Sequence, residues 1–106
     1  MSKQMIVARI YVGESDSGPR GNLMEHIMEV LRDQHRVHGV TVFRGIAGFG
    51  SSGVVHSADL LRLNPNLPLV IEFFDEPEVI EAAVETLNDL IPAGQMISWP
   101  VTCNLD

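Results

Sequence analysis

The segment whose residue types are best suited to binding chemistry covers residues 44–53 and reads RGIAGFGSSG. Four glycines and two serines between Gly45 and Gly53 would let backbone N–H groups turn toward one point, as they do in anion-binding nests. Arg44 would add a cation that suits a phosphate group. The sequence leaves open an alternative, a flexible turn with Arg44 in a surface ion pair, for example to Glu72.

Residues 48–53 also match the G-x-G-x-x-G pattern of dinucleotide-binding folds. That pattern requires a helix directly after the glycines, whereas the β-branched Val54 and Val55 follow here. The chain contains no Gly-Lys-Ser/Thr, which excludes a P-loop. We therefore expect neither a Rossmann domain nor a P-loop.

Acid–base catalysis requires titratable side chains that converge in a pocket, and the candidates are Glu14, Asp16, His56 and Glu72. Nothing in their spacing indicates convergence, so we predict no catalytic residues and no enzyme. An enzyme on the same fold stays an open alternative.

A metal site is the other chemistry to consider. His35 and His38 are three residues apart but lack a clear third ligand, which favours surface histidines. Cys103 is the single cysteine, so it excludes an intrachain disulfide and fits a reducing cytoplasm. We predict no metal and no resident cofactor.

The elements that would position these residues follow from hydrophobic periodicity. Alternation predicts strands over residues 5–12, 40–43, 69–74 and 96–103. Helices are predicted after Asn22, a plausible N-cap, and after Asp75, which we expect to cap the second helix. The order β-α-β-β-α-β indicates an α+β, ferredoxin-like sandwich forming one domain over residues 1–106. Residues 54–63, inside the long connection between the middle strands, look extended.

Apolar side chains occur on both faces of these strands. Two helices can cover only one face of a four-stranded sheet, yet Val7, Tyr11, Phe74 and Trp99 fall among positions that cannot all face the helices. An uncovered apolar sheet face usually marks an association surface. We therefore expect an oligomer; the alternative is that Tyr11 and Trp99 lie singly on the surface of a monomer.

Composition narrows the partners. The 106-residue chain carries a net charge of −7, which disfavours nucleic acid and an anionic membrane surface. No apolar run is long enough to span a bilayer, and no signal peptide is visible. A cytoplasmic protein is expected.

Two short runs give the sequence a family resemblance. Residues 39–42 (GVTV) leading to 48–50 (GFG) resemble the PII signal-transduction proteins, in which such a strand opens the T-loop. The chain is most similar to a compact PII-like branch known only as a conserved domain of unknown function. The similarity extends over almost the whole chain and is carried by residues 11–16 (YVGESD), 44–50 (RGIAGFG), 56–58 (HSA) and 67–72 (LPLVIE).

The resemblance implies a homotrimer that binds nucleotides in clefts between subunits. Carried over, Thr41 and the backbone of residues 48–50 would line the cleft, and the strand over residues 71–74 would offer backbone groups to the base. Arg44, Gly45 and His56 are added because they flank that cleft. The predicted nucleotide-binding set is Thr41, Arg44, Gly45, Gly48, Phe49, Gly50, His56, Glu72 and Phe73.

Departures from regulatory PII proteins shape the expected ligand. The lysine-bearing B-loop has no counterpart, because residues 92–96 (PAGQM) are short and uncharged, and the C-terminal arginines are absent. AMP or ADP is therefore expected in preference to ATP. The shortened T-loop region over residues 45–66 would signal to a regulated protein, such as a membrane transporter or an enzyme. A trimeric adaptor without a small ligand is the alternative.

Overall fold

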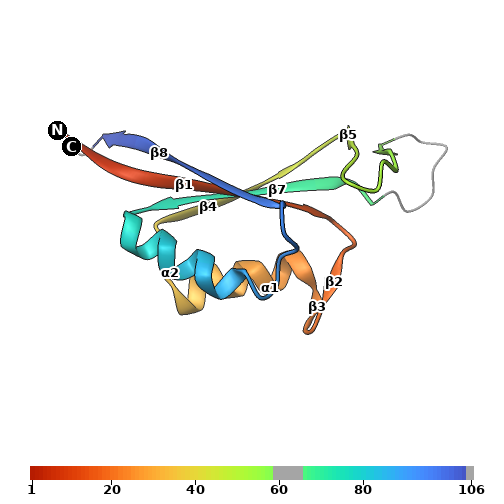
Figure 1. Cartoon of the computed structure of the whole chain (residues 1–106), viewed down its shortest axis with the longest axis horizontal. Coiled ribbons are helices and arrows are strands. Elements are labelled where there is room, and N and C mark those ends of the chain that lie inside the picture. The colour runs from red at the N-terminus through yellow and green to blue at the C-terminus, as the bar shows by residue number, and fades with distance from the viewer. Residues whose placement is uncertain (59–65, 105–106) are drawn as a thin grey trace.

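A four-stranded antiparallel sheet in the order β4-β7-β1-β8 underlies the fold (Figure 1). The computed structural model describes residues 1–58 and 66–104. The strands of this sheet are β1 (Ser2–Gly13), β4 (Gly39–Arg44), β7 (Pro68–Asp75) and β8 (Met96–Asn104). The predicted strands are confirmed, each with slightly wider bounds, and Pro100 lies as expected in an outer strand.

The helices lie together on one face of the sheet (Figure 1). They are α1 (Leu23–Glu29), continued by the π-helical turn η1 (Val30–Gln34), and α2 (Pro77–Leu87). Asn22 caps α1 as predicted, because its side-chain oxygen accepts the Glu25 N–H. Among the described residues no helix is long and apolar enough to cross a bilayer.

The predicted cap of the second helix is wrong by one residue. Glu76 holds the N-cap position and makes no side-chain cap bond, while Asp75 is still paired in β7. The Asp75 carboxylate instead accepts the backbone N–H of His38 and of Glu76, each at 2.7 Å. It therefore ties the start of β4 to the start of α2.

The core lies between the sheet and the helices. Ala8, Ile10 and Val12 from β1 and Ile71 and Phe73 from β7 point into it, as strand alternation requires. The predicted helical stripes meet them and are buried, except that Val84 is only half-buried; their buried members are Leu23, Ile27, Val30, Leu31, Ile80, Ala83, Leu87 and Ile91. The ferredoxin-like arrangement is thus the one predicted.

Two small hairpins complete the described structure. β2 (Ser17–Gly18) pairs with β3 (Gly21–Asn22), and β5 (Ala47–Gly48) pairs with β6 (His56–Ser57). β5 lies at the end of the molecule opposite the chain termini (Figure 1). The prediction of an extended segment over 54–63 is wrong for Val54 and Val55, which are not in a strand, and its part from residue 59 on lies outside the described residues.

Candidate functional site

The outer strand β4 positions the first part of the candidate site. Val40 and Val42 pack against the core, so alternation turns Thr41 and Phe43 to the opposite, open face of the sheet, where both are exposed. Thr41 lies directly beside Glu72 of β7 in the strand register. Two predicted site residues are therefore neighbours on the open face.

An ion pair occupies the middle of that open face. Arg9 Nε donates to Glu72 Oε1 at 2.8 Å, and the Arg9 guanidinium lies 5.5 Å from the centre of the Trp99 ring. Hydrogen bonds to Glu72 and to Tyr11 raise the pKa of Arg9. Apolar side chains surround the pair in the strand register: Val7, Tyr11, Phe43, Val70, Phe74, Ile97 and Trp99. The pair is thus a charged centre in an apolar face.

At the end of β4, Arg44 is held by an acidic partner from another loop. Its guanidinium makes two bonds to the Glu14 carboxylate, at 2.9 and 3.2 Å. The proposed Arg44–Glu72 pair is therefore not formed, because Glu72 is engaged by Arg9. The sequence did not single out the Arg44–Glu14 pair, although each residue lies in one of the four runs that carry the similarity to the PII-like branch.

Around Arg44, hydrogen bonds join the strand ends. Asn66 accepts the Ser15 N–H at 2.8 Å and donates to Asp16 at 3.0 Å, and Asp16 accepts the Gly13 N–H at 2.8 Å. Gly45 N–H donates to the Pro68 carbonyl at 2.7 Å. These bonds fix the base of the segment that leaves the sheet.

The glycine-rich segment is a hairpin rather than an anion-binding nest. Gly48 is paired with His56, and a turn closes by a 2.9 Å bond from Gly53 N–H to the Gly50 carbonyl. Of its glycines, only Gly53 has a positive φ, at 74°. The predicted convergence of N–H groups is not formed, because the Gly53 N–H is bonded to the Gly50 carbonyl and the Gly45 N–H to the Pro68 carbonyl. Gly45 and Gly48 have a steric reason instead, since an added Cβ would lie 2.8 and 3.1 Å from Pro68 Cγ.

The remaining predicted residues separate. His56 is half-buried beside Gly48, Phe49 is 72% exposed near the hairpin turn, and Gly50 starts the turn. Phe73 is fully buried under the helices, and its backbone lies between β4 and β1. Neither its side chain nor its paired backbone is accessible from the open side, so Phe73 is not part of the candidate site.

The carboxylates considered for catalysis are engaged separately. Glu14 binds Arg44, Asp16 binds Asn66 and Gly13 N–H, and Glu72 binds Arg9. His35 meets the Thr86 hydroxyl at 2.9 Å, and the ring of His38 lies 5.3 Å from that of Phe74. Within residues 1–58 and 66–104, no three metal-binding side chains form a cluster.

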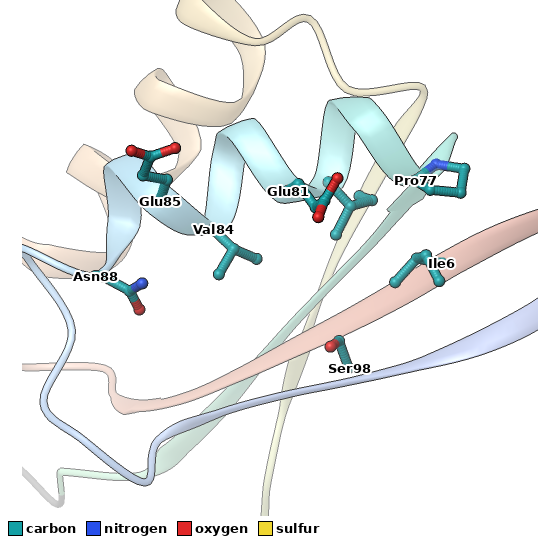
Figure 2. Close-up of a pocket in the computed structure, with 8 residues that line it drawn as sticks. Ile6, Pro77, Glu81, Val84, Glu85, Asn88 and Ser98 are labelled. Carbon is teal, nitrogen blue, oxygen red and sulfur yellow. The ribbon is translucent and has the colours of Figure 1, made fainter.

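Two grooves flank the outer strands on the helix side. One, of about 510 Å³, lies between α2 and strands β1 and β8, and Figure 2 shows Glu81 and Glu85 on α2 above Ile6 and Ser98. The other, of about 440 Å³, lies between the end of η1 and β4 and is lined by Arg32, Arg36 and His38. Neither groove contains a residue of the predicted nucleotide-binding set.

The sequence of the chain was compared with protein families and with known proteins. The model of the DUF190 family, described as "Uncharacterized ACR", matches residues 5–103. A UPF0166 protein of Methanocaldococcus jannaschii is 34% identical over 91 residues, covering 86% of this chain and 82% of that protein.

Solved structures share the fold at low identity. CPII, a nitrogen regulatory PII-like protein from Thiomonas intermedia K12 bound to ADP, AMP and bicarbonate, superposes with a TM-score of 0.69 at 12% identity, over 100% of this chain and 99% of that chain. The divalent cation tolerance protein CutA1 from Thermus thermophilus gives a TM-score of 0.58 at 14% identity, over 92% and 84% of the two chains. These likenesses establish the PII-like, ferredoxin-like fold.

Proposed function

The chain belongs to the DUF190 family, and from this membership and its PII-like fold we propose that it is a non-enzymatic regulatory protein. In this proposal it consists of a single domain, forms a homotrimer and binds an adenine nucleotide in clefts between subunits. AMP and ADP are preferred over ATP. The binding set is Thr41, Arg44, Gly45, Gly48, Phe49, Gly50, His56 and Glu72.

The observation that carries the proposal is the open face of the sheet. Large apolar side chains remain accessible on it, with Tyr11 40%, Phe43 49% and Ile97 47% exposed. Several large apolar side chains exposed on one face are typical of protein–protein contacts. Thr41 and Glu72 lie on this face and line neither groove described above, so among the described residues neither groove encloses them. A neighbouring copy would supply a second wall.

The adenine nucleotide is supported by the CPII structure, which holds ADP and AMP on the same fold. Arg44 supports the phosphate part, because guanidinium groups bind carboxylates and phosphates in the same two-bond geometry. In the free chain the Glu14 carboxylate holds this position, so a phosphate would replace it. The preference for AMP and ADP follows from residues 92–96, which carry no charge to reward a γ-phosphate.

The β5–β6 hairpin is the proposed signalling surface. Ile46 is 81% exposed, Phe49 72% and Val54 55%, so its apolar side chains are accessible to a partner. A nucleotide phosphate that drew Arg44 away from Glu14 would release one contact at the base of this hairpin. The regulated protein, a transporter or an enzyme in our hypothesis, would bind one of the two hairpin states.

Titration calorimetry with AMP, ADP and ATP tests this proposal, on the wild-type protein and on two variants. We expect AMP and ADP to bind no more weakly than ATP. Arg44→Gln should weaken binding about 10–100-fold, because a hydrogen bond to a charged group contributes about 1.5–3 kcal/mol. Glu14→Gln should tighten binding, since it removes the competing carboxylate.

The outcomes separate the alternatives. Tight binding of ATP with no binding of AMP or ADP would refute the proposed preference. Absence of heat with all three nucleotides would favour an adaptor that acts without a small ligand. Equal affinities for wild type and Arg44→Gln would remove Arg44 from the site.

A further inference from the structure

The two grooves beside the outer strands carry opposite charges. The acidic groove is defined by Glu81, Glu85 and Asn88 of the α2 side over Ile6 and Ser98 (Figure 2). The basic groove is defined by Arg32, Arg36 and His38 over Val40. Among the described residues no ion pair involves Glu81, Glu85 or Arg36, whereas Arg32 is partly neutralised by Asp33 at 2.9 Å. Each groove thus presents unbalanced charge beside an open strand edge.

The sheet order gives these edges a geometric relation. Neighbouring strands are all antiparallel in the order β4-β7-β1-β8, so β4 and β8 run in opposite directions. A second copy placed in the same orientation would therefore bring its β4 beside β8 of the first as a further antiparallel pair. This arrangement joins two different edges, so it can repeat from copy to copy and close into a ring.

The helix layer fits the same arrangement. Both helices lie on one face of the sheet, so they would stay on one face of the continued sheet (Figure 1). Strands are about 4.8 Å apart and helices about 10 Å wide, so two helices span roughly the width of four strands. The α2 helix of one copy would then lie next to η1 of its neighbour, and the acidic groove would face the basic groove.

We propose that copies of this chain associate edge to edge, β8 against β4, with Glu81 and Glu85 of one copy paired with Arg32 and Arg36 of the next. This inference rests on the self-association proposed above and adds edge contacts to the open sheet face described there. Local complementarity is needed because each copy carries a net charge of −7, which makes copies repel. Pro100 removes one backbone donor from β8, so strand pairing alone leaves that edge incompletely bonded.

Charge reversal in both grooves tests the pairing by light scattering across a protein dilution series. Glu81→Lys/Glu85→Lys and Arg32→Glu/Arg36→Glu should each raise the concentration for half-assembly at least tenfold. The variant with all four changes should recover the wild-type value, because every junction regains opposite charges. Circular dichroism and melting establish that each variant is folded.

A control separates local pairing from net charge. Glu25→Lys/Glu29→Lys changes exposed positions on α1 that line neither groove, and each substitution adds two charges, so both lysine variants go from −7 to −3. The control should assemble as well as wild type or better, while Glu81→Lys/Glu85→Lys assembles worse.

Three results would overturn the inference. If both double variants assemble like wild type, the grooves are not the junction. If both double variants dissociate and the quadruple variant also stays dissociated, the glutamates of one copy do not contact the arginines of the next. A wild-type mass of 11.7 kDa at all concentrations would instead refute self-association itself, and the junction with it. Nucleotide titration of the wild-type protein, whose assembly the substitutions do not affect, reports separately on the ligand part of the proposed function.

Discussion

The close approach of Gly45 to Pro68 gives a prediction whose size follows from the structure. In Gly45→Ala the new Cβ would lie 2.8 Å from Pro68 Cγ and 3.3 Å from the Pro68 carbonyl oxygen. The two segments cannot simply separate, because Gly45 N–H donates to that same carbonyl at 2.7 Å. Overpacking costs about 1–3 kcal/mol, and the reduced entropy of the unfolded chain returns about 0.4–1 kcal/mol. We expect a net loss of about 1–2 kcal/mol in the free energy of unfolding.

Urea denaturation and thermal melting at equal protein concentration measure this loss, since association would otherwise shift the midpoint. For a domain of this size, the expected change lowers the melting temperature by about 4–16 °C. Gly50→Ala is the matched control, because no atom lies within 4 Å of its added Cβ. Its φ is not positive either, so it should be neutral or stabilising by about 0.4–1 kcal/mol.

A double variant tests the cause. Pro68→Ala removes Cγ and leaves Cβ, which lies 3.6 Å from the added atom, so Gly45→Ala should cost less in that background. If Gly45→Ala is as stable as Gly50→Ala, the contact with Pro68 is not as described. If its cost is unchanged by Pro68→Ala, the strain has another source.

Two further predictions concern the open face and the hairpin. Trp99→Asp should raise the concentration for half-assembly at least tenfold, because a carboxylate would have to be desolvated in an apolar contact. The control Ser17→Asp, at an exposed position of β2, should leave that concentration unchanged. Equal effects of the two substitutions would exclude Trp99 from the interface. Hydrogen exchange should slow around Gly48–Gly50 when ADP binds, because the backbone there belongs to the proposed binding set, while the Gly45 amide, already bonded to Pro68, should be protected in both states. Identical exchange of the hairpin with and without ADP, in a protein shown to bind ADP, would refute the signalling role.

The sheet and helices were predictable because their signals are local. Alternation over β1 separates Ala8 and Ile10 from Arg9 and Tyr11 whatever the strand pairs with. The Asn22 cap likewise depends on four consecutive residues. The wrong cap at Asp75 also comes from a local signal, because aspartate is common both at helix caps and where a strand ends. The sequence does not show that the distant His38 N–H donates to the Asp75 carboxylate.

The site was less predictable because it depends on the strand register. Thr41 and Glu72 become neighbours through pairing across a connection of more than twenty residues, and the partner of Arg44 comes from a loop thirty residues earlier. Glycines also have several uses. The same run can form a nest or a hairpin, and here the nearby Pro68 favours glycine at position 45.

The Arg9–Glu72 pair has a consequence for how copies of the sheet face could meet. A purely apolar face could slide by one or two residues with little penalty, because apolar contacts have no preferred direction. A charged pair with 39% and 28% of its side chains exposed changes this. Any arrangement that buries Arg9 and Glu72 and breaks their ion pair would leave an unpaired buried charge, which is strongly unfavourable. The ion pair would therefore favour one alignment of two copies among many that bury a similar apolar area. It would also disfavour non-specific aggregation through this apolar face.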